Sequence, residues 1–129
     1  IVCVGETLDE NESGQAADVI SRQVRDGLNG RAVKSGANLV VAYEPVWAIG
    51  TGKAATPDDA AVIIRNVIRP TVAGLFGEQV SEEVRVLYGG SVKPNNAADF
   101  FGLEEVDGAL IGGASLKAQD FVAITKAAV

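Results

Sequence analysis

A chain of 129 residues, 47% of them hydrophobic, has the size and composition of one globular domain rather than of a disordered segment. The net charge is −6 and the basic residues are scattered, which argues against nucleic acids and membranes as partners. One cysteine and no histidine exclude an internal disulfide and argue against a zinc site. We therefore expect no cofactor, no metal, no transmembrane segment and a cytoplasmic location.

Short apolar runs and amphipathic segments alternate along the chain. The runs predict buried parallel strands at 1–4, 39–42, 84–88 and 106–111. Helical spacing of apolar residues predicts helices at 15–29, 56–69, 95–101 and 121–128, the first ending at Asn29-Gly30 or at Gly36. Because no hairpin signal interrupts the alternation, we predict a parallel α/β fold of the form βαβαβαβα.

Local signals refine these elements. Thr56, followed by Pro57 and Asp59, predicts a helix start with a capping box, and Pro70 is expected to end or kink that helix near Arg69. The polar stretch 9–14 is expected to form a loop. Two side-chain environments are also predicted: Cys3 as a small buried hydrophobe, and an ion pair between Arg65 and Asp107.

The stretch that follows the second predicted strand carries the strongest functional signal. Glu44 lies at the end of that strand, where catalytic groups of parallel α/β folds collect. The loop over 45–55 is long for a connection from strand to helix, and it contains the apolar run Val46-Trp47-Ala48-Ile49. Two interpretations fit: a lid that excludes water above a catalytic acid, or an ion-paired acid with an ordinary loop packed over it.

Glycine pairs follow the last two predicted strands. Gly89-Gly90, with Ser91 next, comes after 84–88, and Gly112-Gly113 comes after 106–111, each ahead of a predicted helix. Bare N–H groups at glycines, with a helix N-terminus behind them, bind phosphate or sulfate without a cationic side chain. Each pair alone is more often just a tight turn. Together, and beside the long apolar loop, they favour a site for an anion.

Several of these stretches resemble triosephosphate isomerase. Ala42-Tyr43-Glu44-Pro45-Val46-Trp47-Ala48-Ile49-Gly50-Thr51-Gly52-Lys53 is similar to that family's catalytic-base strand and mobile lid. Tyr88-Gly89-Gly90-Ser91-Val92, 107–116 and the opening Cys3-Val4-Gly5-Glu6 match the same family in the right order. The resemblance covers the whole chain but only the C-terminal half of a (β/α)8 TIM barrel, which needs roughly 250 residues. It implies a single half-barrel domain over 1–129, with barrel units five to eight.

The resemblance also implies a function and roles for residues. The family interconverts dihydroxyacetone phosphate and glyceraldehyde 3-phosphate, in glycolysis and gluconeogenesis, by proton transfer through an enediolate. Glu44 would be the catalytic base. Residues implied to bind the substrate phosphate are Gly50, Ser91, Gly112 and Gly113. The lid and its hinges would be Pro45, Val46, Trp47, Ala48, Ile49, Thr51, Gly52 and Lys53. Supporting residues would be Glu6, Tyr88, Gly89 and Gly90, with Glu6 holding the lid through Trp47 or Tyr43 or, alternatively, acting as a second catalytic carboxylate.

The first half of the family's barrel supplies an Asn, a Lys and a His, and this sequence contains no histidine. Because that His polarises the carbonyl group, we expect little or no isomerase activity from these 129 residues alone. The alternative is a non-catalytic phosphate-binding half-barrel, a folding or assembly module. Unpaired strands at the two edges, Ile1–Val4 and Val106–Ile111, predict self-association or pairing with the missing N-terminal half.

Overall fold

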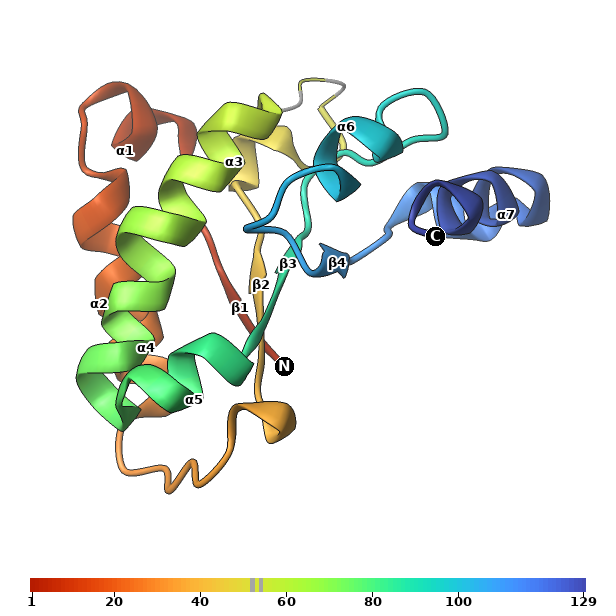
Figure 1. Cartoon of the computed structure of the whole chain (residues 1–129). Helices are drawn as coiled ribbons and strands as arrows, with labels where there is room; N and C mark the ends of the chain where they lie inside the picture. The colour runs from red at the N-terminus through yellow and green to blue at the C-terminus, as the bar shows by residue number, and fades with distance from the viewer. Residues whose placement is uncertain (52, 54) are drawn as a thin grey trace.

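The computed structural model describes residues 1–51, 53 and 55–129, and its strands form one parallel sheet in the order β1-β2-β3-β4 (Figure 1). The strands are β1 (Val2–Val4), β2 (Val40–Tyr43), β3 (Arg85–Tyr88) and β4 (Gly108–Ala109). In the register of the sheet, Val4 lies beside Tyr43, and Tyr43 lies beside Tyr88. Neighbouring strands are consecutive in the chain, as in the wall of a barrel. The predicted parallel α/β fold is confirmed.

Helices connect the strands and follow the last one. They are α1 (Leu8–Glu12), α2 (Ala16–Leu28), α3 (Pro57–Ile63), α4 (Arg69–Phe76), α5 (Glu78–Glu83), α6 (Ala97–Phe101) and α7 (Ala118–Ala127). Short 3-10 turns are η1 (Gly36–Asn38), η2 (Val46–Ala48) and η4 (Gly113–Leu116), and η3 (Ile64–Ile68) is a π-helical turn. Within the described ranges, no helix combines the length and apolar character needed to cross a membrane.

Capping boxes begin two of these helices. At α3 the Thr56 hydroxyl accepts from the N–H of Asp59 at 3.1 Å, and the Asp59 carboxylate accepts from the N–H of Thr56, as predicted. The same arrangement of Thr7 and Glu10 begins α1, so the prediction of a loop over 9–14 is wrong. Both boxes satisfy N–H groups that a helix start leaves without partners, which explains why so short a segment as α1 is helical.

The helix through Pro70 does not end near Arg69. It continues as α4 to Phe76, directly after the π-helical turn η3. Proline lacks an N–H, and its ring crowds the carbonyl one turn back in a regular α-helix. A wider turn just ahead of the ring relieves that conflict, and so the chain accommodates the proline without ending the helix.

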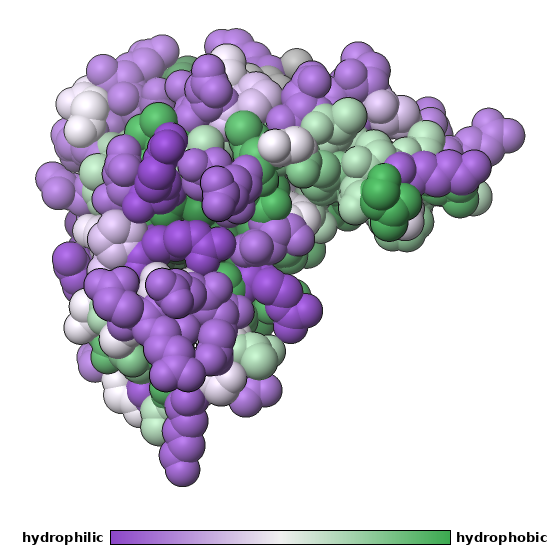
Figure 2. Space-filling view, viewed as in Figure 1, coloured by the Kyte–Doolittle hydropathy of each residue, from purple (hydrophilic) through white to green (hydrophobic). Residues whose placement is uncertain are grey.

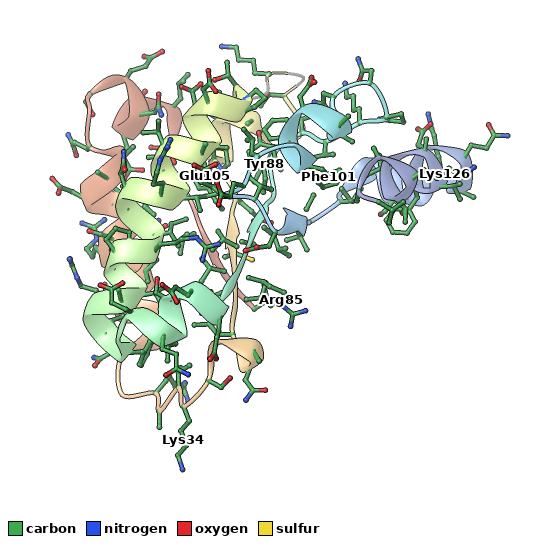
Figure 3. All side chains as sticks on the ribbon, in the orientation of Figure 1. Lys34, Arg85, Tyr88, Phe101, Glu105 and Lys126 are labelled. Carbon is green, nitrogen blue, oxygen red and sulfur yellow. The ribbon has the colours of Figure 1, made fainter. Side chains whose placement is uncertain are left out.

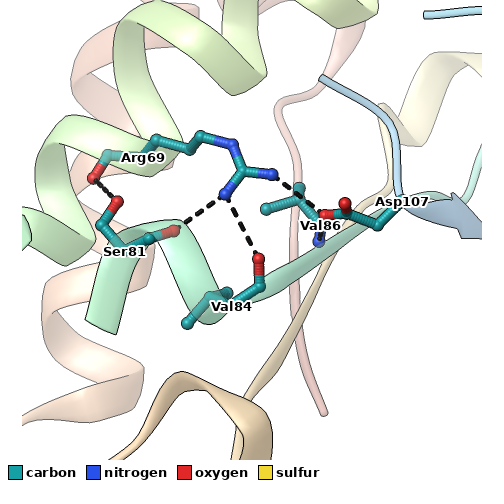
Figure 4. A network of polar contacts seen from close by, with 5 residues as sticks. All are labelled: Arg69, Ser81, Val84, Val86 and Asp107. Carbon is teal, nitrogen blue, oxygen red and sulfur yellow. Dashed lines mark hydrogen bonds and ion pairs between the residues drawn. The ribbon is translucent and has the colours of Figure 1, made fainter. Parts of the chain in front are cut away.

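Arg69 joins α4 to α5 and to the last two strands (Figure 4). Its guanidinium donates to the carbonyls of Ser81 at 2.8 Å and Val84 at 3.2 Å, and it pairs with the Asp107 carboxylate at 3.0 Å. The same carboxylate accepts from the N–H of Val86 at 2.6 Å. One arginine therefore fixes the helix layer to the start of β3 and to the residue before β4.

Two predicted side-chain environments are wrong. Arg65 does not pair with Asp107, which Arg69 holds, and lies instead 3.3 Å from Glu105. Cys3 is exposed rather than buried. Its side chain points to the face of the sheet opposite the helices, because neighbouring residues of a strand point to opposite faces.

Only one face of the sheet carries a helix layer in the described part of the chain. Val4, Val86 and Tyr88 point into the core beneath α2, α3 and α4, whereas Cys3 and Arg85 lie on the other face and are exposed. Figure 3 shows Arg85 extending from β3 away from the helices. Parallel sheets are normally covered on both faces, so this open face is a surface whose packing is incomplete.

The last strand and last helix reach away from this core. β4 is shorter than the predicted 106–111, although the flanking N–H groups of Asp107 and Leu110 still bond to β3 at 2.9 Å. Beyond it, α7 projects to one side of the molecule (Figure 1), and hydrophobic surface is visible over this extension (Figure 2). Leu116 is 87% exposed, and Phe121 and Val122 are also exposed. The segment from η4 through α7 therefore has apolar side chains that the described part of the chain leaves exposed.

Candidate functional site

The carboxyl ends of β2, β3 and β4 open onto one cleft of about 980 Å³. Its lining includes an acid and three glycine-containing segments predicted from the sequence: Glu44, Gly50, Gly89, Gly90, Ser91, Gly112 and Gly113. Parallel strands bring their carboxyl ends to the same edge of a sheet, which is why residues distant in sequence meet here. Among the residues described, no group of three His, Cys, Asp or Glu side chains is arranged to hold a metal ion.

Glu44 is positioned by close backbone approach at two glycines. Its N–H donates to the Val4 carbonyl at 2.7 Å, and its own carbonyl lies so near Gly5 that a Cβ there would overlap it. On the side-chain side, a Cβ at Gly89 would also overlap the Glu44 stem and lie 3.1 Å from its Oε1. The carboxylate is half-buried and faces the cleft. Glycine at both positions lets β1 and β3 enclose the acid.

Glu6 lies behind the cleft and is completely buried. Its Oε1 accepts from the Asn11 side chain and from the Trp47 indole N–H, both at 2.9 Å, and the Tyr43 hydroxyl lies 3.2 Å away. Glu6 therefore contacts both of the residues proposed to connect it to the lid, and it is not among the residues that line the cleft. Burial, and next the charge of Glu6, raises the pKa of Tyr43 well above its ordinary range.

Asn11 was missed by the sequence analysis. It lies on α1, which the capping box of Thr7 and Glu10 holds against the end of β1. The signal that could have found it is the pattern Thr-x-x-Glu directly after Glu6, because a helix beginning there returns a side chain toward the acid.

The loop after Glu44 begins at Pro45 and forms the 3-10 turn η2. Its apolar residues differ in exposure: Ala48 is buried and Trp47 half-buried, whereas Val46 is 50% and Ile49 46% exposed. Ile49 and Gly50 lie at the cleft. The loop therefore presents exposed apolar side chains beside a half-buried acid.

The end of the loop holds the remaining predicted hinge residues. The Thr51 hydroxyl donates to the Trp47 carbonyl at 2.8 Å and accepts from the N–H of Lys53 at 3.2 Å. Lys53 is exposed. Gly52, also predicted for this hinge, lies outside the described residues.

The glycine segments do not lead straight into helices. After Gly90 comes the loop 91–96, and α6 begins only at Ala97, whereas Gly112 leads into the single 3-10 turn η4. Asn96 braces the first loop, since its side chain donates to the Ser91 carbonyl at 3.0 Å and accepts from the N–H of Lys93 at 2.7 Å. The helices that follow the glycines lie close to the predicted positions, α6 against the predicted 95–101 and α7 (Ala118–Ala127) against the predicted 121–128, but a loop or a 3-10 turn separates each from its glycines.

Tyr88 is the last residue of β3 and directly precedes Gly89 and Gly90. It is fully buried between α3 and α6 (Figure 3), and its ring stacks on Phe100 with centroids 4.1 Å apart and planes 8° apart. Burial raises the pKa of its hydroxyl.

Two basic residues that were not predicted from the sequence, Lys93 and Lys117, also line the cleft. Lys117 directly follows the segment 107–116, so its position next to that motif was the available signal.

Comparison with known proteins agrees with this geometry. The family model for triosephosphate isomerase matches residues 1–128. The chain is 58% identical over 127 residues to the triosephosphate isomerase of Chlorobium luteolum, a match that covers 98% of this chain and 50% of that protein. It is 55% identical over 129 residues to that of Chlorobium phaeobacteroides, with 100% and 51% covered. For Chloroherpeton thalassium the identity is 53% over 128 residues, with 99% and 50% covered.

These matches extend over nearly the whole chain, although the chain spans about half the length of the curated relatives it matches. The parallel order of the strands and the cleft at their carboxyl ends are what half of a (β/α)8 barrel provides. On sequence and on fold, this chain belongs to the triosephosphate isomerase family.

Proposed function

We propose that this chain supplies the catalytic base and most of the phosphate site of a triosephosphate isomerase. The observation that supports this most is that Glu44 and the glycine segments after β3 and β4 line one cleft. An acid beside an anion site suits a reaction in which a phosphorylated substrate loses and regains a proton. A cytoplasmic location is part of the same proposal.

In the proposed reaction, Glu44 removes a proton from the carbon next to the carbonyl of a triose phosphate. The electron pair of the broken C–H bond forms an enediolate. The substrate's hydroxyl proton then moves to the former carbonyl oxygen, and Glu44 returns its proton to the neighbouring carbon, so that atoms and charge balance. The loop that carries Trp47 and Ile49 would close over the site and exclude water, which otherwise competes for the proton. Glu6 would anchor this loop through the indole of Trp47.

The phosphate would bind at the far end of the cleft from Glu44. Main-chain N–H groups near Gly112, Gly113 and Gly50, together with Ser91, would hold its oxygens. Lys93 and Lys117 also line the cleft, and their positive charges offset the repulsion that a chain of net charge −6 exerts on a phosphate. Inorganic phosphate or sulfate is expected to occupy the same place.

We further propose that the isolated chain has little or no activity, because its cleft lacks the histidine of the family's first half. Complementation with the other half of the Chlorobium luteolum enzyme, supplied as a separate polypeptide, tests both statements. We expect turnover to appear only in the mixture, and Glu44→Gln to lower it at least about 100-fold. Glu12→Gln, an exposed acid on α1, is the matched control and should leave turnover unchanged.

Two outcomes would contradict this proposal. Near-native turnover by the chain alone would refute its inactivity. A complex that forms between the two polypeptides but shows no difference between Glu44→Gln and Glu12→Gln would refute the role of Glu44 as the base.

A second candidate is a non-catalytic half-barrel that binds phosphate and self-associates. The exposed face around Cys3 and Arg85 and the exposed Leu116 favour it, because uncovered sheet and apolar helix surfaces promote association. Light scattering at micromolar concentration should then give a mass at least twice the 13.3 kDa of one chain. Pairing with an N-terminal half would replace this association, whereas a monodisperse monomer of the isolated chain would count against self-association.

A further inference from the structure

Gln23 of α2 makes two hydrogen bonds to Gly5, the residue that follows β1. Its Oε1 accepts from the N–H of Gly5 at 2.7 Å, and its Nε2 donates to the carbonyl of Gly5 at 3.0 Å. A side-chain amide that bonds to the N–H and the carbonyl of one residue replaces the two hydrogen bonds that a neighbouring strand would make. The contact bridges 18 positions of sequence and is partly buried. No motif in the sequence assigned a role to Gln23.

The residue that Gln23 holds lies behind the cleft, between the backbone of Glu44 and Glu6. Gly5 approaches the carbonyl of Glu44 so closely that it has no room for a side chain. The next residue is Glu6, whose buried carboxylate accepts from the Trp47 indole at 2.9 Å. A shift of the Gly5 backbone would therefore move the backbone of Glu44 and would also move Glu6, which bonds to the Trp47 indole.

We propose that Gln23 is a positioning residue. It fixes the position of the Gly5 backbone, and thereby holds Glu6 against Trp47 and β1 against Glu44. This inference rests on the proposed roles of Glu44 and the lid. The amide suits the task because it satisfies both the N–H and the carbonyl of one residue, on the outer side of β1 away from β2. Neither a carboxylate nor an apolar side chain does both.

Nuclear magnetic resonance of the 129-residue chain tests the proposal without any need for turnover. Trp47 is the only tryptophan, so its indole N–H gives one resolvable signal that reports on the bond to Glu6. In Gln23→Leu we expect the Gly5 amide to exchange with solvent at least about fivefold faster, the factor for one hydrogen bond of ordinary net strength. We also expect the Trp47 indole signal to shift. Gln79→Leu, in which an exposed glutamine of α5 loses only a contact to Glu83, should change neither signal.

Gln23→Glu provides a second variant in case the leucine variant does not fold. Its carboxylate still accepts from the Gly5 N–H but cannot donate to the Gly5 carbonyl, so Gly5 exchange should stay slow while the indole signal shifts. An unchanged indole signal in either folded Gln23 variant would overturn the proposal, because Gln23 would then hold Gly5 without affecting the lid anchor. An unchanged Gly5 exchange rate in Gln23→Leu would overturn it as well. Because neither readout involves catalysis, an inactive chain leaves both results valid.

Discussion

Replacing Gly5 with alanine should destabilise the chain far more than an ordinary glycine substitution. The new Cβ would lie well inside 3.0 Å of the Glu44 carbonyl, and because the obstacle is backbone, no side-chain rotation relieves the overlap. β1 and β2 must then separate, which weakens the 2.7 Å bond from Glu44 to Val4 and the pair with Gln23. Three hydrogen bonds at about 1 kcal/mol each, plus about 1–3 kcal/mol for overpacking, give a loss of about 4–6 kcal/mol.

Urea unfolding, followed by Trp47 fluorescence and far-ultraviolet circular dichroism, measures this loss. A loss of that size is a large part of the stability of a typical domain, about 5–15 kcal/mol, so the variant should be partly unfolded without denaturant. Gly27→Ala in α2 is the control, since its Cβ would meet only a Val2 methyl at 3.2 Å. It should gain up to about 1 kcal/mol from helix propensity. A Gly5→Ala chain within about 1 kcal/mol of the unsubstituted chain, with an unchanged urea slope, would refute the close approach.

Three further substitutions test other parts of the structure. Arg69→Met should lower the free energy of unfolding by about 2–3 kcal/mol in urea, because it removes donors to two carbonyls and a partly exposed ion pair with Asp107. A loss below about 1 kcal/mol would contradict that role. Partial burial, and next the charge of Glu44, raises the pKa of the Cys3 thiol, so iodoacetamide should alkylate it more slowly than free cysteine at mildly alkaline pH. Glu44→Gln should speed that reaction, and an unchanged rate would show that the carboxylate lies too far away. Hydrogen bonds, first from the Ser35 side chain, lower the pKa of Glu83 in the folded chain. The ionised Glu83 therefore stabilises the fold above its ordinary pKa, and this contribution is lost as pH falls through the lowered pKa. Glu83→Gln should therefore make the urea midpoint less sensitive to acidification, and an equal or greater sensitivity would contradict the assignment.

The elements that form the site were predictable because they depend on local sequence. Glu44, Gly89 and Gly112 each end an apolar run, and a parallel sheet brings such ends together whatever the exact length of each strand. The start of α3 was predictable for a similar reason, since a capping box needs only residues three positions apart. Even β4, much shorter than predicted, carries its glycines to the cleft.

The contacts that depend on how elements pack were not predictable in the same way. Arg65 and Arg69 lie one turn apart, so on a regular helix they share a face and either could have reached Asp107. The π-helical turn between α3 and α4 changes the rotation of the helix, and Arg69 is the one that reaches the sheet. Similarly, the partners that Glu6 finds in Asn11, and Gly5 in Gln23, depend on where α1 and α2 lie against β1.

The open face of the sheet runs toward the cleft. Cys3 lies beside Ala42 in the sheet, and Glu44 follows Ala42 by two residues, which places both on the same face by the alternation of a strand. A partner that covered this face would therefore reduce the water that reaches Glu44. A base that must hold and return a proton needs little competing water, and the loop from Pro45 to Lys53 can exclude it from one side only. If Glu44 acts as the proposed base, association and turnover would therefore be linked. The absence of turnover in a monomer would reflect the open face as well as the missing histidine, and only an associated form separates the two causes.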